Sequence, residues 1–145
     1  MRITLDTNVL VSAHSPGAGD GRQLLVKILR ESHRLVLSQT IRYELEEVLR
    51  YPRIRQLYGL TDLQIRTYPE LLIDVADLVD LGPPVEIPLT DRDDWTVLRT
   101  AIDGNADILC TNDGGFFKVP ALAFCARFDL RVIKPHDLLT HLMQP

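Results

Sequence analysis

The stretch ITLDTNVLVSA, residues 3–13, begins like a buried strand and then places an acid where buried strands avoid one. Ile3 and Leu5 are apolar residues of the kind that fill a core, and a second apolar run starts at Val9. Asp6 stands between the two runs, although a carboxylate is costly to desolvate unless a charged or hydrogen-bonding group meets it. This interruption makes Asp6 the first candidate functional residue of the chain.

Apolar strand-like segments alternate with amphipathic helical segments along the rest of the chain. The expected strands are RITLD (2–6), RLVLS (34–38), DILCT (107–111) and RVIKP (131–135). The expected helices are one capped by Asp20, one over 41–49, a helical region over about 53–80, one closed by Gly104 and Asn105, and one over 135–143 entered at Pro135. Pro69 is expected at a break or in a first turn, because a proline inside a helix removes a hydrogen bond. The alternation favours a parallel sheet covered on both faces by helices.

Length and composition bound the class of protein. With 145 residues, 46% of them hydrophobic, the chain is expected to form a single domain over residues 1–145. No apolar run approaches the ~18 residues of a membrane span, and Asp6 interrupts the first apolar run, so neither a membrane segment nor a signal peptide is expected. Cys110 and Cys125 are too few for a disulfide framework and lie among apolar residues. We therefore expect reduced, core-packed thiols in a cytoplasmic protein.

Two acids are expected at the same edge of the sheet. Asp6 ends the first strand, and Asp113 follows directly on the strand DILCT. In open parallel sheets, ligands bind beyond the carboxyl ends of the strands, where helices leave in opposite directions. If these two strands are parallel, both carboxylates reach that edge.

Two further acids are expected to face inward from helices. At about 100° per residue, Glu44 lies at the edge of the apolar face of the helix that follows the second strand. Asp94 stands four residues before Leu98, which places it on the buried side of the first turn of its helix. Each acid also has a structural explanation: Asp94 could cap its helix, Glu44 could be a solvated flank residue, and Asp113 could form a turn. Together these explanations leave open why inward-facing acids gather where this architecture binds ligands.

Such a cluster of carboxylates favours a hard metal ion. Clustered carboxylates repel one another, and some take up protons unless a cation compensates them. Mg²⁺ and Mn²⁺ prefer oxygen ligands, and Mg²⁺ commonly keeps several waters beside one or two carboxylates and a phosphate. The four histidines are scattered and the two cysteines fit no zinc pattern. The sequence therefore indicates a site for Mg²⁺ or Mn²⁺, where one metal would activate water and a second could stabilise a leaving oxygen.

The charge balance leaves a nucleic-acid partner open. The net charge of −4 argues weakly against one, but several of the acids are candidates for binding cations. Thirteen of the sixteen basic residues are arginines, and RYPRIR (50–55) carries three of them, Arg50, Arg53 and Arg55. A guanidinium suits phosphate because its planar fork can donate two hydrogen bonds at once. These arginines are candidate RNA contacts, with a solvated helix end as the alternative.

Four stretches of the chain carry a resemblance to a known family. They are LDTNVLVSA with Asp6, LVLSQTIRYELEEVLRYPRIR with Glu44, DRDDWTVLRTAIDGNADILCTND with Asp94 and Asp113, and the closing RVIKPHDLL. In these stretches the chain resembles PIN-domain ribonucleases, in particular the bacterial PIN-family toxin components of toxin–antitoxin systems. The resemblance covers essentially the whole chain.

This resemblance implies a three-layer α/β/α sandwich with a central, mainly parallel sheet. It also implies metal-dependent endonucleolytic cleavage of single-stranded RNA. The acids that would hold Mg²⁺ or Mn²⁺ are Asp6, Glu44, Asp94 and Asp113. Asn8 and Thr111 match small polar residues of the family that orient the acids or a water. Proteins of this kind usually form homodimers and pair with a small antitoxin that occludes the active site.

The chain departs from the family pattern at three places. Gly115 stands where many relatives carry a further acid, and Trp95 takes a place often held by Asn or Asp. DRDD (91–94) offers three aspartates for one essential position, which makes Asp91 a candidate auxiliary to Asp94. These departures bear on the number of metal ions rather than on the four acids.

Other functions fit the sequence less well. A haloacid-dehalogenase-type phosphatase needs a second acid two residues after the first, and Asn8 stands there. A receiver domain needs its acid pair early in the chain, whereas the pair here comes late. The strongest alternative is a PIN fold that acts as an RNA- or protein-binding module with little or no nuclease activity.

Overall fold

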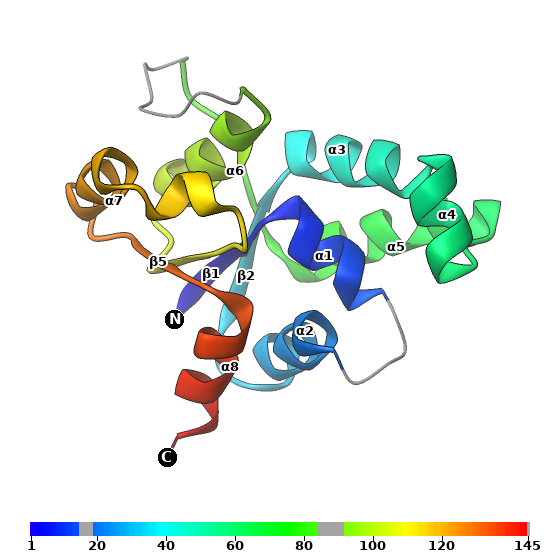
Figure 1. Cartoon of the computed structure of the whole chain (residues 1–145), viewed down its shortest axis with the longest axis horizontal. Coiled ribbons are helices and arrows are strands. Elements are labelled where there is room, and N and C mark those ends of the chain that lie inside the picture. The colour runs from blue at the N-terminus through cyan, green and yellow to red at the C-terminus, as the bar shows by residue number, and fades with distance from the viewer. Residues whose placement is uncertain (15–18, 84–91, 145) are drawn as a thin grey trace.

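The protein is built around a parallel β-sheet (Figure 1). A computed structural model describes residues 1–14, 19–83 and 92–144. The strands of this described part are β1 (Arg2–Leu5), β2 (Arg34–Ser38), β3 (Asp77–Val79), β4 (Ile108–Cys110) and β5 (Arg131–Ile133). They form one sheet in the order β3-β2-β1-β4-β5, and each neighbouring pair is parallel.

Helices cover both faces of this sheet. Within the described residues they are α1 (Thr7–Ala13), α2 (Asp20–Arg30), α3 (Gln39–Leu49), α4 (Pro52–Tyr58), α5 (Asp62–Val75), α6 (Arg92–Asp103), α7 (Val119–Ala126) and α8 (Pro135–Met143), with a 3₁₀ turn η1 over Gly114–Phe117. Figure 1 shows α6 and α7 on one side of the strands and α2 and α8 on the other, with α4 at one end of the molecule. The expected three-layer α/β/α sandwich with a parallel central sheet is confirmed. None of the described helices is long and apolar enough to cross a membrane.

The strand order places the start and the middle of the chain side by side. β1 lies between β2 and β4, and Leu5 is in register with Cys110. After β1 the chain turns into α1, whereas after β4 it turns into η1 and α7, so helices leave these two strands toward opposite faces. The carboxyl ends of β1 and β4 therefore flank the switch point at which open α/β sheets bind ligands.

The core is assembled from the strands and the inward faces of the helices. The side chains of Ile3, Leu5 and Leu109 are 0% exposed, as are those of Leu24 and Ile41 from helices on the sheet. Cys110 and Cys125 are both free and buried, which confirms the expectation of core-packed thiols. Burial and the nearby carboxylate of Asp6 raise the pKa of the Cys110 thiol to about 12, so this sulfur stays protonated.

Most expected elements are present, with small shifts at their ends. The strand over 34–38 and the helix that follows it match β2 and α3. α6 ends where Gly104 and Asn105 were expected to close it, and a Cβ on Gly104 would lie 2.4 Å from Cγ1 of Val36, so only glycine fits there. The N-cap of α2 is Gly19, whereas Asp20 is the first helical residue, where its charge favours the helix dipole.

The helical region expected over about 53–80 is partly wrong. It contains two helices, α4 and α5, and then the strand β3. Pro69 lies inside α5 rather than at a break or in a first turn. Its missing N–H costs one helical hydrogen bond, but Pro69 is buried on the same face as Ile65 and Leu72, so packing offsets the loss. Strand β3 escaped detection because its three residues are too short for an alternating pattern.

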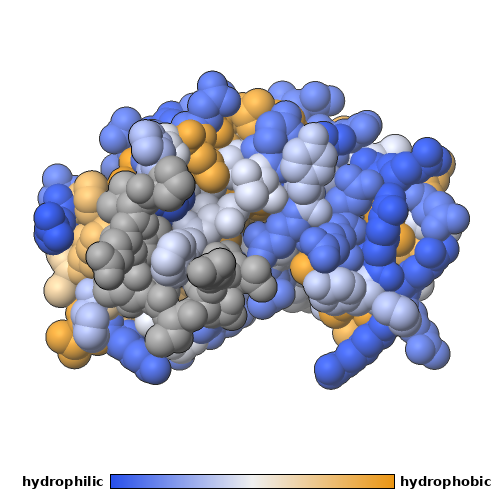
Figure 2. All heavy atoms as spheres, turned by 90° about the horizontal axis from the view of Figure 1, so that it is seen from above, coloured by the Kyte–Doolittle hydropathy of each residue, from blue (hydrophilic) through white to orange (hydrophobic). Residues whose placement is uncertain are grey.

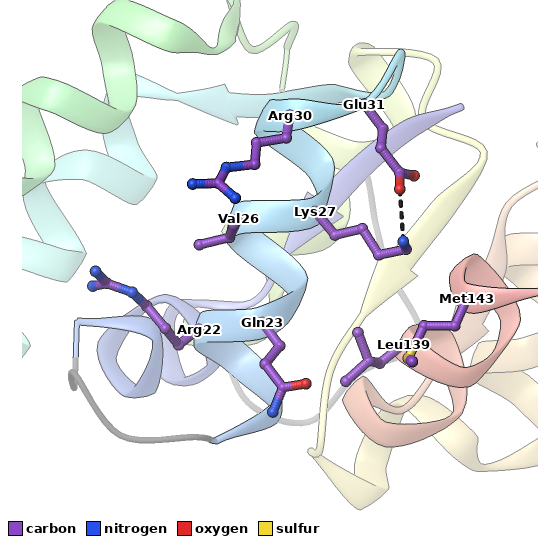
Figure 3. A pocket seen from close by; sticks show the side chains of 8 residues that line it. All are labelled: Arg22, Gln23, Val26, Lys27, Arg30, Glu31, Leu139 and Met143. Atoms are coloured by element: carbon purple, nitrogen blue, oxygen red, sulfur yellow. Dashed lines mark hydrogen bonds and ion pairs between the residues drawn. The ribbon is translucent and has the colours of Figure 1, made fainter.

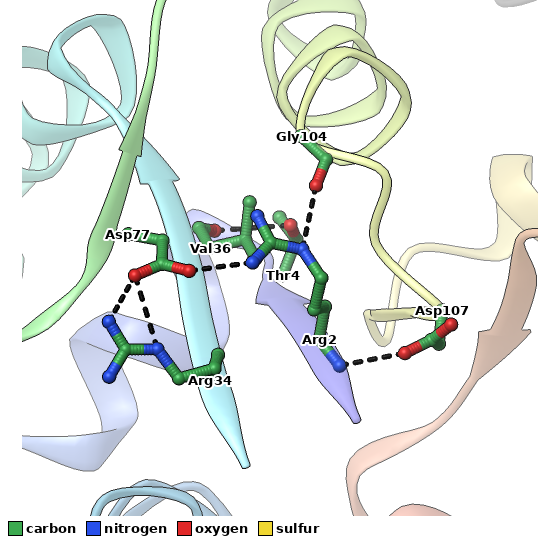
Figure 4. A network of polar contacts seen from close by, with 7 residues as sticks. All are labelled: Arg2, Thr4, Arg34, Val36, Asp77, Gly104 and Asp107. Atoms are coloured by element: carbon green, nitrogen blue, oxygen red, sulfur yellow. Dashed lines mark hydrogen bonds and ion pairs between the residues drawn. The ribbon is translucent and has the colours of Figure 1, made fainter.

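The amino edge of the sheet, where the strands begin, is held by paired charges (Figure 4). Arg34 donates two hydrogen bonds to Oδ1 of Asp77, and Nη1 of Arg2 donates one to Oδ2 of the same carboxylate at 2.6 Å. The backbone N–H of Arg2 donates to Oδ2 of Asp107 at 2.8 Å. These two arginines lower the pKa of Asp77 to about 2, so the carboxylate is ionised throughout the physiological range.

Candidate active site

Asp6 is fixed at the carboxyl edge of the sheet, where the strands end. Its backbone N–H donates to the carbonyl of Cys110 at 2.9 Å, which extends the β1–β4 ladder by one residue. Its side chain then caps α1, because Oδ1 accepts a hydrogen bond from the backbone N–H of Thr7 at 2.7 Å. The cap turns the chain sharply and leaves the carboxylate at the switch point between β1 and β4.

The carboxylate of Asp6 is buried without a basic partner among its described contacts. Only 7% of the residue is exposed. Burial raises the pKa of Asp6, and the negative charge of Asp113 raises it further. The hydrogen bonds from Thr111 and from the N–H of Thr7 lower it only in part. A carboxylate with this environment is one that a bound cation would stabilise.

Thr111 joins Asp6 to Asp113. Its hydroxyl donates to Oδ2 of Asp6 at 2.6 Å and accepts the backbone N–H of Asp113 at 3.0 Å. Thr111 is 0% exposed and continues β4, so its position is fixed by the sheet. Asp113 in turn caps η1, since its Oδ1 accepts the N–H of Gly115 at 2.9 Å. The structure thus brings these two predicted acids together through a predicted supporting residue.

Glu44 reaches the same region from α3. Its Oε2 accepts a hydrogen bond from the hydroxyl of Thr7 at 3.2 Å, and the side chain is half-buried, as its place at the edge of the apolar face predicts. Since Thr7 also donates its N–H to Asp6, one threonine holds two of the predicted acids. α3 is anchored at its start by Ser38, whose hydroxyl accepts the N–H of Ile41 at 3.3 Å.

Asp94 comes from the opposite layer. It lies in the first turn of α6 and is half-buried. α6 packs on β1, β2 and α3, and the hydroxyls of Ser38 and Thr100 share a buried hydrogen bond of 2.8 Å. This contact ties the start of α3 to the middle of α6 at the end of β2. The helices that carry Glu44 and Asp94 are therefore fixed to one another.

The remaining supporting residues have different surroundings. Asn8 is exposed in the first turn of α1, next to Thr7. Asp91 lies outside the described residues. At Gly115, where the resemblance implies a further acid, the chain contributes a backbone N–H to Asp113 instead of a carboxylate.

Three hydroxyl residues of the site were not predicted from the sequence: Thr7, Ser38 and Thr100. Each is buried and each hydrogen-bonds a partner from a different element. Thr7 had a local signal, because it directly follows an acid at a strand end. Thr100 had none, since a threonine on an amphipathic helix commonly bonds its own backbone, as Thr100 also does with the carbonyl of Thr96.

The carboxylates of the site suit a hard cation in their chemistry but not in their number. Within residues 1–14, 19–83 and 92–144, no group of three or more His, Cys, Asp or Glu side chains is arranged to hold a metal ion. Asp6 and Asp113, whose charges interact, offer only oxygen atoms. Mg²⁺ is commonly bound by one or two carboxylates, with water and substrate phosphate completing its shell. The pair therefore fits an open Mg²⁺ or Mn²⁺ site rather than a closed cage.

The arginines of RYPRIR are divided by the fold. Arg50 is the C-cap of α3, and Arg53 and Arg55 belong to α4. Arg50 and Arg55 line a surface pocket of about 400 Å³ together with Arg66 of α5. Arg53 is exposed and does not line that pocket.

Comparisons with known proteins agree with the fold. A family model described as the PIN domain matches residues 2–114. A chain from the crystal structure of VapBC2 from Rickettsia felis, bound to a DNA fragment from their promoter, is 15% identical with a TM-score of 0.58, and the match covers 92% of this chain and 98% of that one. A chain from the crystal structure of FitAcB from Neisseria gonorrhoeae is 18% identical with a TM-score of 0.53, over 92% of this chain and 98% of that one. No curated protein matches the chain.

Proposed function

The chain belongs to the PIN domain family, whose members are generally nucleases, and on that premise we propose that it is a divalent-metal-dependent endoribonuclease that cleaves single-stranded RNA. The observation that supports this most strongly is the buried carboxylate of Asp6 beside Asp113 at the carboxyl edge of the sheet. Two acids with no basic partner among their described contacts suit a cation and, through it, a phosphodiester.

In this proposal each residue at the edge has a separate task. The metal-holding acids are Asp6, Glu44, Asp94 and Asp113. Bound Mg²⁺ or Mn²⁺ would activate water and stabilise the charge that develops on the phosphate. Thr111 holds the Asp6 carboxylate and the turn before Asp113 in place, and Thr7 does so for Glu44. Asn8 and Asp91 are proposed to support the acids or to position water.

The RNA is proposed to contact the arginines at the end of α3 and on α4. Arg50, Arg53 and Arg55 are exposed or half-exposed there. Arg50 and Arg55 also form surface ion pairs with Glu46 and Asp62, each at 2.8 Å. Contacts of this kind position a nucleic acid without reading its sequence.

We further propose that the protein is the toxin of a toxin–antitoxin pair. The resemblance of its motifs to bacterial PIN-family toxin components supports this, and VapBC2 and FitAcB contain chains with the same fold. The expected partners are RNA, a small antitoxin that covers the carboxyl edge, and a second copy of this chain in a homodimer. The expected location is the cytoplasm, in keeping with two cysteines that are free and buried.

The direct test compares the wild-type protein with the Asp6→Asn variant on a labelled single-stranded RNA. We expect cleavage by the wild type in millimolar Mn²⁺ or Mg²⁺ and none with EDTA. The variant should cleave more slowly by orders of magnitude while its circular dichroism spectrum stays unchanged. Undiminished cleavage by the variant would remove Asp6 from the proposed mechanism.

One observation favours the alternative of a binding module. No group of three or more potential ligands within the described ranges is arranged to hold a metal ion. A module of this kind would retain RNA in a gel-shift experiment and leave it intact in Mn²⁺. That combination of results, with the wild-type protein, would replace the nuclease proposal by this alternative.

A further inference from the structure

A pocket at the junction of α3, α4 and α5 gathers three arginines. Its volume is about 400 Å³, and it is lined by Arg50, Arg55, Asp62, Ile65 and Arg66. These residues come from three different helices, although Arg50 and Arg55 are close in sequence and Arg66 is not. Figure 2 shows mostly hydrophilic residues over the end of the molecule where α4 lies.

The charges that line the pocket are not balanced. Arg55 pairs with Asp62 at 2.8 Å, and Arg50 pairs with Glu46, which does not line the pocket, also at 2.8 Å. Among the described residues, Arg66 has no carboxylate partner. Among the described lining residues, three arginines share the pocket with a single carboxylate, that of Asp62, so a bound anion would add a favourable interaction there.

The kind of anion follows from the donors. Guanidinium groups are planar forks that bind phosphate and carboxylate through two parallel hydrogen bonds. Several forks around one cavity suit phosphate best, because its oxygens point in several directions whereas a carboxylate offers a single plane. Of the described residues that line the pocket, Ile65 alone is apolar, which leaves little surface for an apolar ligand.

Helix α3 connects the pocket to the carboxyl edge of the sheet. α3 carries Glu44 in its middle and Arg50 at its end, six positions later, which is about 9 Å along a helix axis. Proteins hold single-stranded nucleic acids in positively charged grooves that follow the backbone over several nucleotides. In the proposed function, one strand would contact both places.

We propose that Arg50, Arg55 and Arg66 form a phosphate-binding pocket, separate from the carboxylates, that holds a backbone phosphate of the RNA several nucleotides from the bond that is cut. The inference rests on the proposed function for the source of the phosphate. It adds Arg66, which is distant in sequence from RYPRIR, and it leaves Arg53 outside the pocket.

A second pocket with cationic side chains lacks this arrangement. It has a volume of about 410 Å³ and lies between α2 and α8. There Lys27 pairs with Glu31 at 2.6 Å, and Val26, Leu139 and Met143 contribute apolar lining. Figure 3 shows Arg22 and Arg30 extending away from Leu139 and Met143. This pocket does not direct several cations at one point.

The test measures RNA affinity where no cleavage occurs. In the Asp6→Asn background, with fluorescence anisotropy of a labelled single-stranded RNA, Arg66→Gln should weaken binding by about tenfold. It should also lower the slope of log K against log salt by about 0.7, the value for one phosphate contact on a single strand. The matched control is Arg131→Gln, an exposed arginine at the start of β5, at the amino edge. An equal loss in both variants, or no loss in either, would overturn the proposal.

A second variant is expected to act in the opposite direction. Asp62→Asn frees Arg55 and removes the one carboxylate among the described lining residues, so RNA binding should tighten. Its control is Asp74→Asn, an exposed aspartate near the other end of α5. Weaker or unchanged binding by Asp62→Asn would count against the pocket even if Arg66→Gln proved unstable.

Inorganic phosphate distinguishes the possible sources of the ligand. At constant ionic strength, phosphate should displace RNA from the protein with Arg66 and much less from Arg66→Gln. Phosphate binding that depends on Arg66, without any effect of Arg66 on RNA affinity, would assign the pocket to a free phosphate and overturn the RNA assignment.

Failure of the nuclease proposal and failure of the pocket proposal give different results. RNA that is bound through Arg66 but never cut would overturn the nuclease and leave the pocket. If the wild type and the single variant Arg66→Gln bind RNA with equal affinity and cut it equally well, the pocket proposal would be overturned and the nuclease proposal would stand.

Discussion

The two edges of the sheet shift the pKa of their carboxylates in opposite directions. At the amino edge, Asp77 is held between Arg2 and Arg34, and its pKa falls to about 2 (Figure 4). At the carboxyl edge, Asp6 is buried beside Asp113, and its pKa rises. The same residue type thus stabilises the fold at one edge and is unfavourably placed at the other.

The difference between the two edges lies in what surrounds their carboxylates. At the amino edge the opposite charges are supplied by the protein, so nothing further is needed there. At the carboxyl edge the described contacts of Asp6 and Asp113 are hydroxyl and amide donors, which orient the carboxylates without neutralising them. This unfavourable placement supports the proposal that a cation and a substrate bind at the carboxyl edge.

The largest expected difference between the edges is in cleavage. Asp113→Asn should lower the rate of RNA cleavage by about 100-fold or more, because a lost metal ligand costs several kcal/mol of transition-state stabilisation. Asp77→Asn removes the same charge at the amino edge and should leave cleavage unchanged. The measurement is the cleavage rate of labelled RNA in Mn²⁺. Equal rates for the two variants would erase the distinction between the edges.

The next effect is expected from the hydroxyl link. Thr111→Val keeps the shape of a fully buried residue but removes the donor to Asp6 and the acceptor for the Asp113 N–H. Loss of such an orienting contact should lower cleavage by about tenfold to 100-fold. Thr111→Ser restores the hydroxyl and should recover most of the rate. A serine variant as slow as the valine variant would point to packing instead.

A smaller effect is expected in thermal stability. Since the folded-state pKa of Asp6 is raised above 3.8, its ionisation opposes folding, and this penalty grows as the pH rises through the folded-state pKa. Without metal at pH 7, Asp6→Asn should therefore melt at the same temperature as the wild type or a few degrees higher. Mn²⁺ at about 100 times its Kd should stabilise the wild type by about 2.7 kcal/mol and the variant much less. Melting curves with and without Mn²⁺ test both points, and an equal metal response would exclude Asp6 as a ligand.

The smallest effect is expected at the amino edge. Because the pKa of Asp77 is lowered from 3.8 to about 2, its ion pairs stabilise the fold above pH 3.8 and are lost as the pH falls toward 2. The charges are partly exposed, so the contribution is modest. Asp77→Asn should melt a few degrees lower at pH 7 and show a weaker loss of stability in acid than the wild type. If the wild type and Asp77→Asn lost the same stability between pH 4 and pH 2, this role of Asp77 would be contradicted.

Much of the fold could be predicted from local patterns. β2, α3 and α8 each have clear apolar periodicity, and Pro135 marks the start of α8. The interior proline of α5 could not be predicted in this way, because Pro69 is tolerated there through its burial. The strand β3 could not be predicted either, because it is short. Local propensity is a weak prior where tertiary packing decides.

The candidate site divides in a similar way. Asp6 interrupts an apolar run, and Asp113 follows a strand, so both could be found by reading along the chain. The roles of Ser38 and Thr100 could not, because these two residues bond each other across 62 positions of the chain. Arg66 had no signal either, since the two arginines that share its pocket, Arg50 and Arg55, come from the end of α3 and from α4.

The sequence by itself determined the alternation of strands and helices and the positions of acids at strand ends, because burial and backbone periodicity act over a few neighbouring residues. Only the tertiary structure decided that β1 lies beside β4, and hence that Asp6 and Asp113 share Thr111. It likewise decided that Asp77 meets two arginines. Electrostatic and hydrogen-bonding partners are chosen by distance in space, which depends on strand order rather than on position along the chain.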